Sequence, residues 1–139
     1  MSTDAEVTVE GGCLCGTVRY RADATPSNSM ICHCTSCRRA AGAPVVAWIT
    51  VSANAFAFVR GEPSRYASSP GVERTFCARC GTPLTYVHTR RPEGVDITTA
   101  SLDRPEAFPP TWHGWTEDSV SWVRFGDDLP RHRKVPSAE

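Results

Sequence analysis

The sequence has no long hydrophobic run and no excess of charge of either sign. Its longest apolar stretch, Ala43–Ile49, contains a proline and is far shorter than the roughly 20 residues of a membrane-spanning helix, so we expect no membrane contact. Fifteen basic residues balance fifteen acidic ones. The clustered positive charge typical of nucleic-acid-binding proteins is therefore missing, and no nucleic-acid partner is expected. The acidic segment Met1–Glu6 has no apolar core and is not predicted to be a signal peptide.

Helical periodicity is also scarce, because eleven prolines and ten glycines interrupt the chain throughout. Between them lie short stretches rich in β-branched and aromatic residues, which are typical of strands. One or two helical turns are expected through Arg38–Ala41, ended by Gly42, and another near Pro105–Ala107. The sequence thus predicts a mainly β fold with few short helical turns. The predicted strands are Thr17–Arg21, Val45–Val51, Phe56–Arg60, Arg65–Ala67, Glu73–Phe76, Leu84–Val87, Val95–Thr99 and Val120–Phe125.

The length of 139 residues fits one domain. We predict a single domain over residues 1–139, with an ordered core of about residues 6–130. The two ends, residues 1–5 and 131–139, are expected to be loose. A sheet protein of this size has a modest core, so bound metal is expected to contribute to its stability.

Seven cysteines are the unusual feature of the composition, and a closed disulfide framework would leave one of them unpaired. They fall into three tight clusters, C-x-C, C-x-C-x-x-C and C-x-x-C, which suit metal ions better than long-range disulfides. Buried apolar cysteines are common singly, but this clustering is not typical of them. Because no export signal is visible and a reducing cytosol disfavours disulfides, we expect a cytoplasmic protein. The cysteines are Cys13, Cys15, Cys32, Cys34, Cys37, Cys77 and Cys80.

Two of the clusters together offer four thiolates. Cys13 and Cys15 point to the same side if the backbone between them is extended. Cys77 and Cys80 form a C-x-x-C turn, and Gly81 after it permits the left-handed conformation that closes such a turn. Four thiolates make the closed tetrahedral arrangement of a structural zinc site. The alternative is a C-x-x-C redox pair, but the strand–helix context typical of that motif is not visible.

The remaining cluster, Cys32, Cys34 and Cys37, supplies three ligands within six residues. Three protein ligands with an open fourth position describe a catalytic zinc site. Alternation along the chain points His33 away from the three sulfurs, so we expect it to be a polar neighbour and not a ligand. Arg38 and Arg39 follow directly; they could stabilise the thiolates and hold an anionic substrate, or they could be solvated charges on a short helix.

At these residues the sequence resembles the glutathione-dependent formaldehyde-activating enzyme (GFA) family, whose domain type also occurs in centromere protein V. The resemblance implies a β-tent of small antiparallel sheets around a structural zinc. It also implies two zinc ions per chain, the second less fully occupied, and carbon–sulfur lyase chemistry that joins formaldehyde and glutathione into S-hydroxymethylglutathione. The matching elements are Gly11–Gly16 with Val18–Tyr20, Cys32–Arg39 with Gly42, Arg74–Leu84, Ser101–Asp103, His113, Trp122 and Asp127–Pro130.

The leading functional hypothesis is the addition of a small-molecule thiol to a small aldehyde at the open zinc, or the reverse reaction. A proton donor must then protonate the alkoxide that forms, and His113 and Asp103 are the candidates. A second hypothesis is a zinc-stabilised binding module without turnover, with an aromatic surface formed by tryptophans between Trp112 and Trp122. A third is a thiol redox sensor in which the three-cysteine cluster is oxidised and releases its ion.

Overall fold

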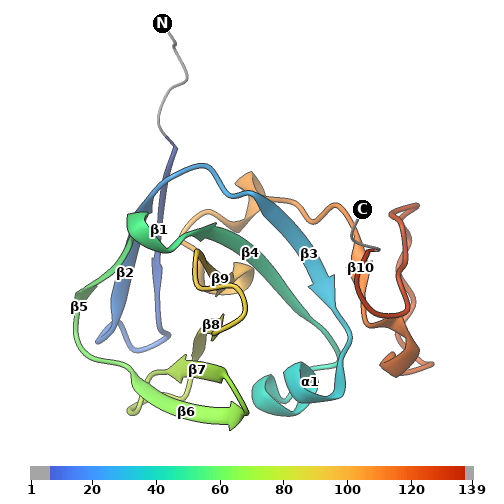
Figure 1. The fold of residues 1–139 in the computed structure, drawn as a ribbon, viewed down its shortest axis with the longest axis horizontal. Coiled ribbons are helices and arrows are strands. Elements are labelled where there is room, and N and C mark those ends of the chain that lie inside the picture. Colours follow the sequence, from blue (N-terminus) through green and yellow to red (C-terminus); the bar gives the residue numbers. More distant parts are fainter. Residues whose placement is uncertain (1–6, 137–139) are drawn as a thin grey trace, which may run out of the picture.

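The computed structural model describes residues 7–136 and consists mainly of strands in two sheets (Figure 1). The smaller sheet has the order β1-β2-β5, and the larger has the order β10-β3-β4-β9-β8-β7-β6. Paired strands are antiparallel except β10, which runs parallel to β3. This architecture confirms the predicted mainly β fold. The strands are β1 Thr8–Gly12, β2 Arg19–Asp23, β3 Asn28–Cys32, β4 Val46–Ser52, β5 Phe56–Arg60, β6 Ser64–Ser69, β7 Val72–Phe76, β8 Pro83–His88, β9 Gly94–Thr98 and β10 His113–Gly114.

Residues 7–136 contain one α-helix, α1 (Thr35–Ala41), which lies between the end of β3 and the start of β4 in Figure 1. Cys34 is its N-cap, and Gly42 ends it with a φ of 62°, as the sequence predicted. The predicted turn at Pro105–Ala107 is also present, as a 3-10 helix. Within residues 7–136, no helix is both long and apolar enough to cross a membrane. The 3-10 helices are Ala53–Ala55, Thr99–Ser101, Pro105–Ala107 and Thr116–Asp118.

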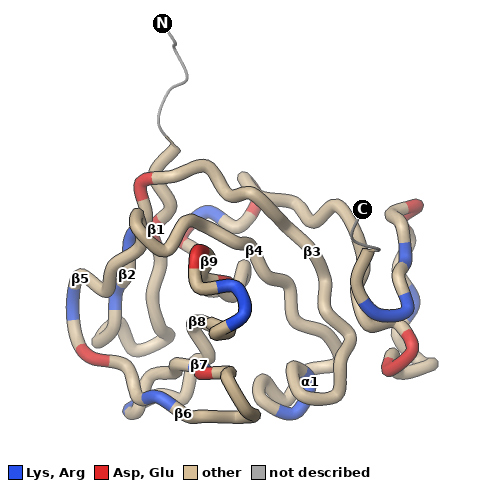
Figure 2. The backbone as a smooth tube through the Cα atoms, in the orientation of Figure 1, with Lys and Arg blue, Asp and Glu red and all other residues tan. Residues whose placement is uncertain are grey.

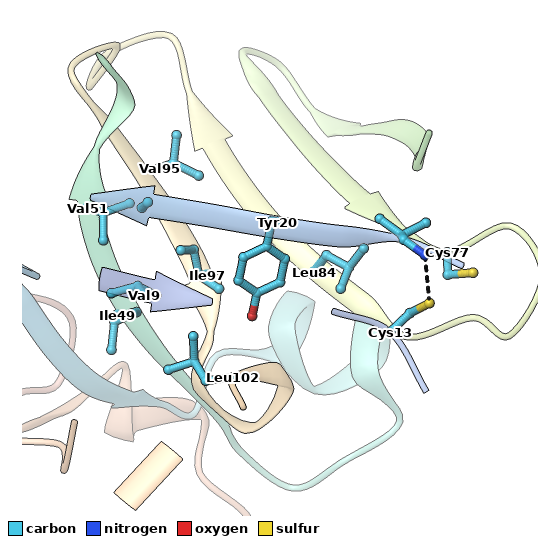
Figure 3. Close-up of a cluster of buried hydrophobic side chains, with 12 residues drawn as sticks. Val9, Cys13, Tyr20, Ile49, Val51, Cys77, Leu84, Val95, Ile97 and Leu102 are labelled. Atoms are coloured by element: carbon cyan, nitrogen blue, oxygen red, sulfur yellow. Dashed lines mark hydrogen bonds between the residues drawn. The ribbon is translucent and has the colours of Figure 1, made fainter. Parts of the chain in front are cut away.

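The main core lies between the two sheets and joins them to the first cysteine cluster. Tyr20 from the smaller sheet packs among Ile49, Leu84 and Ile97 from the larger one (Figure 3). The hydroxyl of Tyr20 lies 2.6 Å from that of Ser101, so this buried polar atom is satisfied. Figure 3 also shows the buried thiols of the first cluster at one end of this core, which means that metal binding and core packing meet there.

Five segments of the chain differ from the sequence-based expectation. Val120–Phe125 is not a strand, and β1, β3 and β10 were not predicted. The segment 131–134, expected to be loose, is hydrogen-bonded to the chain around β10: the Trp115 amide donates to the Lys134 carbonyl at 2.7 Å, and the His132 amide donates to His113 at 2.9 Å. Residues 1–5 lie outside the described part of the chain.

Candidate metal centres

The first cysteine cluster brings together sulfurs from two distant turns. The sulfurs of Cys13, Cys15, Cys77 and Cys80 all lie within 4.8 Å of one another. Cys15 is 3.7 Å from Cys13 and 3.8 Å from Cys77, sulfur to sulfur. A tetrahedral ion with metal–sulfur bonds of about 2.3 Å requires sulfur separations of about 3.8 Å. The four residues predicted for a structural site therefore fit one metal ion.

Backbone amides point at these sulfurs and fix the two turns. The Val18 amide donates to the Cys13 sulfur at 3.3 Å, the interaction whose dashed line ends on Cys13 in Figure 3. The amides of Arg79 and Cys80 donate to the Cys77 sulfur at 3.3 and 3.4 Å. Such bonds stabilise a sulfur that carries negative charge, as a metal-bound thiolate does.

Two of the cluster's thiols are also shifted toward the thiolate by neighbouring threonines. The hydroxyl and amide of Thr82 lower the pKa of Cys80 to about 5. The hydroxyl and amide of Thr17 lower the pKa of Cys15 in the same way. Because metal ligands must lose their protons, these contacts favour metal binding.

The second cluster is local and sits where β3 passes into α1. The sulfurs of Cys32, Cys34 and Cys37 lie within 4.8 Å of one another, so they too could hold a metal ion. Cys32 ends β3, and Cys37 occupies the first turn of α1. The N-cap sulfur of Cys34 accepts a hydrogen bond from the Cys37 amide at 3.3 Å. The helix cap therefore folds the third ligand back onto the first two, as the C-x-C-x-x-C spacing predicted.

Within the second cluster, the surroundings of Cys34 favour its thiolate form most strongly. Hydrogen bonds from Cys32 and Cys37 lower the pKa of Cys34 to about 2, and the positive charge of Arg74 contributes in the same direction. Hydrogen bonds with Cys34 and Cys37, together with burial, raise the pKa of Cys32. These contacts favour the thiolate form of Cys34, next to two thiols that a bound cation would deprotonate.

The second cluster opens into a groove of about 650 Å³, which we name the cysteine groove. Its volume lies in the range of pockets that accept small molecules. Its walls include four aromatic side chains as well as the three sulfurs and a few charged side chains. The first cluster does not line it. Its lining includes Met30, Cys32, Cys34, Cys37, Trp48, Thr50, Arg74, Tyr86, Arg91, Asp96, Trp112, Trp115 and Asp118.

Arg74 stands at the edge of the cysteine groove and touches the cluster. Its guanidinium donates to the Cys37 sulfur at 3.7 Å and lies 4.9 Å from the centre of the Tyr86 ring. It also borders a second hollow of about 730 Å³, the arginine groove, which shares Cys37 and Trp48 with the first. The arginine groove is further lined by Arg39 and Tyr66. Positive charge therefore lies between the cluster and this second hollow.

The arginines proposed as anion-binding residues lie on α1, which carries basic residues in Figure 2, and their surroundings differ. Arg39 is exposed and lines the arginine groove. Arg38 lines neither groove; its guanidinium donates to the Thr35 hydroxyl at 3.2 Å, within the helix.

The two proton-donor candidates lie away from the cysteine groove. Asp103 forms an ion pair with Arg19 of β2, which lowers the pKa of its carboxyl. His113 is fully buried and lies 2.9 Å from His33, ring nitrogen to ring nitrogen. Burial, with the charges of His113 and Arg131, lowers the pKa of His33. His33 points away from the sulfurs, as alternation predicted. Neither His113 nor Asp103 is among the described residues that line the cysteine groove.

Sequence reasoning missed the four charged residues that line the groove, Arg74, Arg91, Asp96 and Asp118. Arg74 reaches Cys37 only because β7 lies opposite α1 across the groove, and no local motif marks that contact. Asp118 approaches the helix from a 3-10 turn far along the chain, where its carboxylate accepts a bond from the Thr35 amide at 3.4 Å. An acidic residue paired with a helix start is a common capping signal, but its separation of 83 positions hides it.

Comparison with known proteins fits this arrangement. The family model of the glutathione-dependent formaldehyde-activating enzyme matches residues 8–118, which include both cysteine clusters. A Halomonas elongata protein with the provisional name glutathione-dependent formaldehyde-activating enzyme is 34% identical over 128 residues, covering 84% of this chain and 80% of that protein. The chain belongs to the GFA family.

Two further relatives of this GFA chain are more distant in coverage or in sequence. A protein named as an uncharacterized lyase of Schizosaccharomyces pombe is 34% identical over 85 residues, so the match spans only 58% of each chain. A crystal structure of a Rhodobacter sphaeroides protein superposes with a TM-score of 0.57 at 20% identity, covering 88% of this chain and 98% of that one. The latter shows a shared fold.

Proposed function

We propose that this GFA-family chain is a zinc-dependent enzyme of the carbon–sulfur lyase type, which joins a small thiol to a small aldehyde or separates them. Glutathione and formaldehyde are the first substrates to test, because the family description and the Halomonas relative name them. The observation that carries the proposal is the division of the cysteines. Four close one site, whereas Cys32, Cys34 and Cys37 offer only three ligands at the wall of a groove.

Zinc suits both clusters by its chemistry. It prefers four ligands in a tetrahedron and accepts thiolate sulfur readily, and a site with three protein ligands keeps one position open. Bound to Cys32, Cys34 and Cys37, the ion would stabilise a substrate thiolate at that position. The reduced thiols that both sites need suit a cytoplasmic location, since all seven cysteines are free.

In this proposal, Arg74 and Arg39 bind negatively charged groups of the bound substrate. Three thiolates on a divalent cation leave one negative charge, and an incoming substrate thiolate adds another. Arg74, 3.7 Å from the Cys37 sulfur, stabilises that added charge. Arg39 borders the adjoining arginine groove, where a carboxylate of a thiol such as glutathione would find a positively charged partner.

Asp118 is the group that we assign to proton transfer. The net reaction moves the thiol proton to the aldehyde oxygen while a sulfur–carbon bond forms and the carbon–oxygen double bond becomes single. Two carboxylates line the cysteine groove. Asp96 is engaged by Arg91 at 2.8 Å and by Thr50 at 2.7 Å. Asp118 accepts only a long bond, from the Thr35 amide, among the described residues, and is therefore free to take up and return a proton.

The side chains of the groove walls hold the thiol and the aldehyde close to each other. Trp48 and Tyr86 meet edge to face with ring centres 5.9 Å apart, and Trp112 is fixed by a 2.8 Å bond from its indole nitrogen to Asn28. These rigid rings narrow the space above the sulfurs. Holding thiol and aldehyde together in a confined space accelerates a bimolecular addition even without stronger activation.

The experiment is a direct rate measurement on protein loaded with zinc. The formation of the thiol–aldehyde adduct is followed by NMR with glutathione and formaldehyde, with the uncatalysed reaction as the reference. Cys34→Ser, which keeps a helix-capping side chain but removes a metal ligand, is the matched variant. We expect a faster rate with the wild-type chain and the uncatalysed rate with Cys34→Ser. Loaded protein that leaves the rate unchanged for every thiol and aldehyde tried would refute the enzyme assignment.

A further inference from the structure

Behind the second cluster, on the side away from the cysteine groove, three polar side chains form a continuous line that is buried at its two histidines and partly exposed at Asp127. Nε2 of His33 lies 2.9 Å from Nδ1 of His113, and Nε2 of His113 lies 3.1 Å from Oδ2 of Asp127. The two histidines are 3% and 0% exposed. Burying such groups is costly unless they are hydrogen-bonded, so each ring depends on its neighbour for a partner. The mechanism above uses none of the three residues.

The direction of each hydrogen bond follows from the end of the line. The carboxylate of Asp127 also accepts from the Leu129 amide at 3.0 Å, through Oδ1. An ionised carboxylate only accepts, so Nε2 of His113 carries a proton and donates to it. With one proton on each ring, Nδ1 of His113 accepts and Nε2 of His33 donates. Phe125 packs edge-on against both rings, with centres 5.5 and 4.7 Å away, and holds them in place.

His33 carries this line to the metal cluster because it stands between two of the ligands. Its amide donates to the Gly114 carbonyl at 3.0 Å, and its ring is held by His113. The residue between Cys32 and Cys34 is thus fixed at both its backbone and its side chain. Since successive residues point to opposite faces, fixing the His33 ring on one face fixes the two sulfurs on the other.

We propose that the chain Asp127–His113–His33 positions the Cys32–Cys34 segment for the second metal ion. The inference rests on the proposed function, because it requires a metal at the three-cysteine cluster. His33, His113 and Asp127 are positioning residues and touch neither metal nor substrate. Residues that orient metal ligands from outside the coordination sphere typically change metal affinity by about 10- to 100-fold when they are replaced.

The test compares the metal affinities of the two sites by competition with a chelator. His113→Leu removes the partner of His33 at similar volume, whereas His113→Asn places an amide oxygen where Nδ1 lies and can still accept from His33. We expect His113→Leu to weaken the second site by at least about tenfold, with the first site unchanged and the affinity largely restored in His113→Asn. Asp128→Asn, at an exposed neighbour of Asp127, is the control and should match the wild type.

A second measurement tests the hydrogen bonds between Asp127, His113 and His33 directly, through the ¹⁵N NMR signals of the two imidazoles. Both carboxylate oxygens of Asp127 lie near Nε2 of His113, at 3.2 and 3.1 Å, and Asp127→Asn replaces one of them with an amide nitrogen and removes the negative charge. We therefore expect the ¹⁵N signals of both imidazoles to move in Asp127→Asn and to stay unchanged in Asp128→Asn. This variant keeps the inference testable even where His113→Leu does not fold.

The outcomes separate the inference from the function on which it rests. Unchanged second-site affinity in His113→Leu, parallel weakening of both sites, or imidazole signals unmoved in Asp127→Asn would each overturn the positioning chain while leaving the metal site intact. A wild-type chain that binds no second metal ion would overturn both. A second ion that depends on His113 in a chain without adduct-forming activity would support the inference and refute the enzyme assignment.

Discussion

The first cluster is expected to stabilise the fold through the length of chain that it closes. Cys15 and Cys77 are 62 positions apart, so an ion shared by them removes the freedom of a long loop from the unfolded chain. The chain-entropy relation for a cross-link of this length gives about 4 kcal/mol. For a domain of this size, a change of 1 kcal/mol moves the melting temperature by about 4 °C. Loss of the ion should thus lower the melting temperature by about 15 °C.

Cys15→Ala is the cleanest way to remove that ion, because Cys15 is the exposed member of the cluster and its replacement leaves the buried core intact. The assay is thermal unfolding followed by circular dichroism, with metal content measured on the same sample. Cys34→Ser is the comparison, because the second cluster spans only residues 32–37 and closes no long loop. We expect it to lower the melting temperature by less than about 4 °C.

The reasoning would be refuted by either of two results. One is a Cys15→Ala protein that has lost a metal ion and yet melts at the wild-type temperature. The other is an equal loss of stability in Cys15→Ala and Cys34→Ser, which would mean that loop length does not set the contribution of each ion.

Three further predictions concern single side chains. Arg74→Gln removes a hydrogen bond from a charged donor to the second cluster; we expect a KM for glutathione raised about tenfold, measured by initial rates, and an unchanged KM would contradict its assignment. Asp118→Asn should lower kcat about a hundredfold, whereas Asp103→Asn should retain activity, because Asp103 pairs with an arginine away from the groove; the reverse order would restore Asp103 as the proton donor. Burial raises the pKa of Tyr20 above its ordinary value near 10, so folding favours the neutral phenol. Its stabilising contribution is present below pH 10 and is lost as the pH rises from there through the raised pKa; urea unfolding at pH 8 and above 10 should show this loss, and Tyr20→Phe should abolish that part of it.

Local patterns in the sequence predict much of the fold. Alternation of apolar and polar residues places most of β2, stretches rich in β-branched and aromatic residues place most of β4 and all of β5, and Gly42 marks the end of α1 correctly. The error at Val120–Phe125 has a physical reason. Its β-branched and aromatic residues are typical of a strand, but Trp122 is 73% exposed, and Phe125 packs on the two buried histidines instead of joining a sheet. A local pattern shows which residues are apolar, but it does not show whether another strand is available for the segment to pair with.

The metal ligands could be predicted because cysteine chemistry is local, whereas the groove could not. The grouping of four and three sulfurs follows from spacing and is confirmed by their proximity. The contact of Arg74 with Cys37 and the approach of Asp118 to Thr35 depend on pairing between distant segments, which no short motif records. For the same reason the sequence predicts His113 only as a candidate proton donor. Its burial behind the cluster follows from the pairing of β10 with β3.

The central claim is that the second cluster holds a zinc ion with one position open to a thiol. X-ray absorption at the zinc edge, with and without glutathione, tests it most directly. We expect the average number of sulfur neighbours per zinc to rise when glutathione is added, and Cys34→Ser to abolish that rise. A sulfur count that glutathione leaves unchanged in fully loaded wild-type protein would contradict the account.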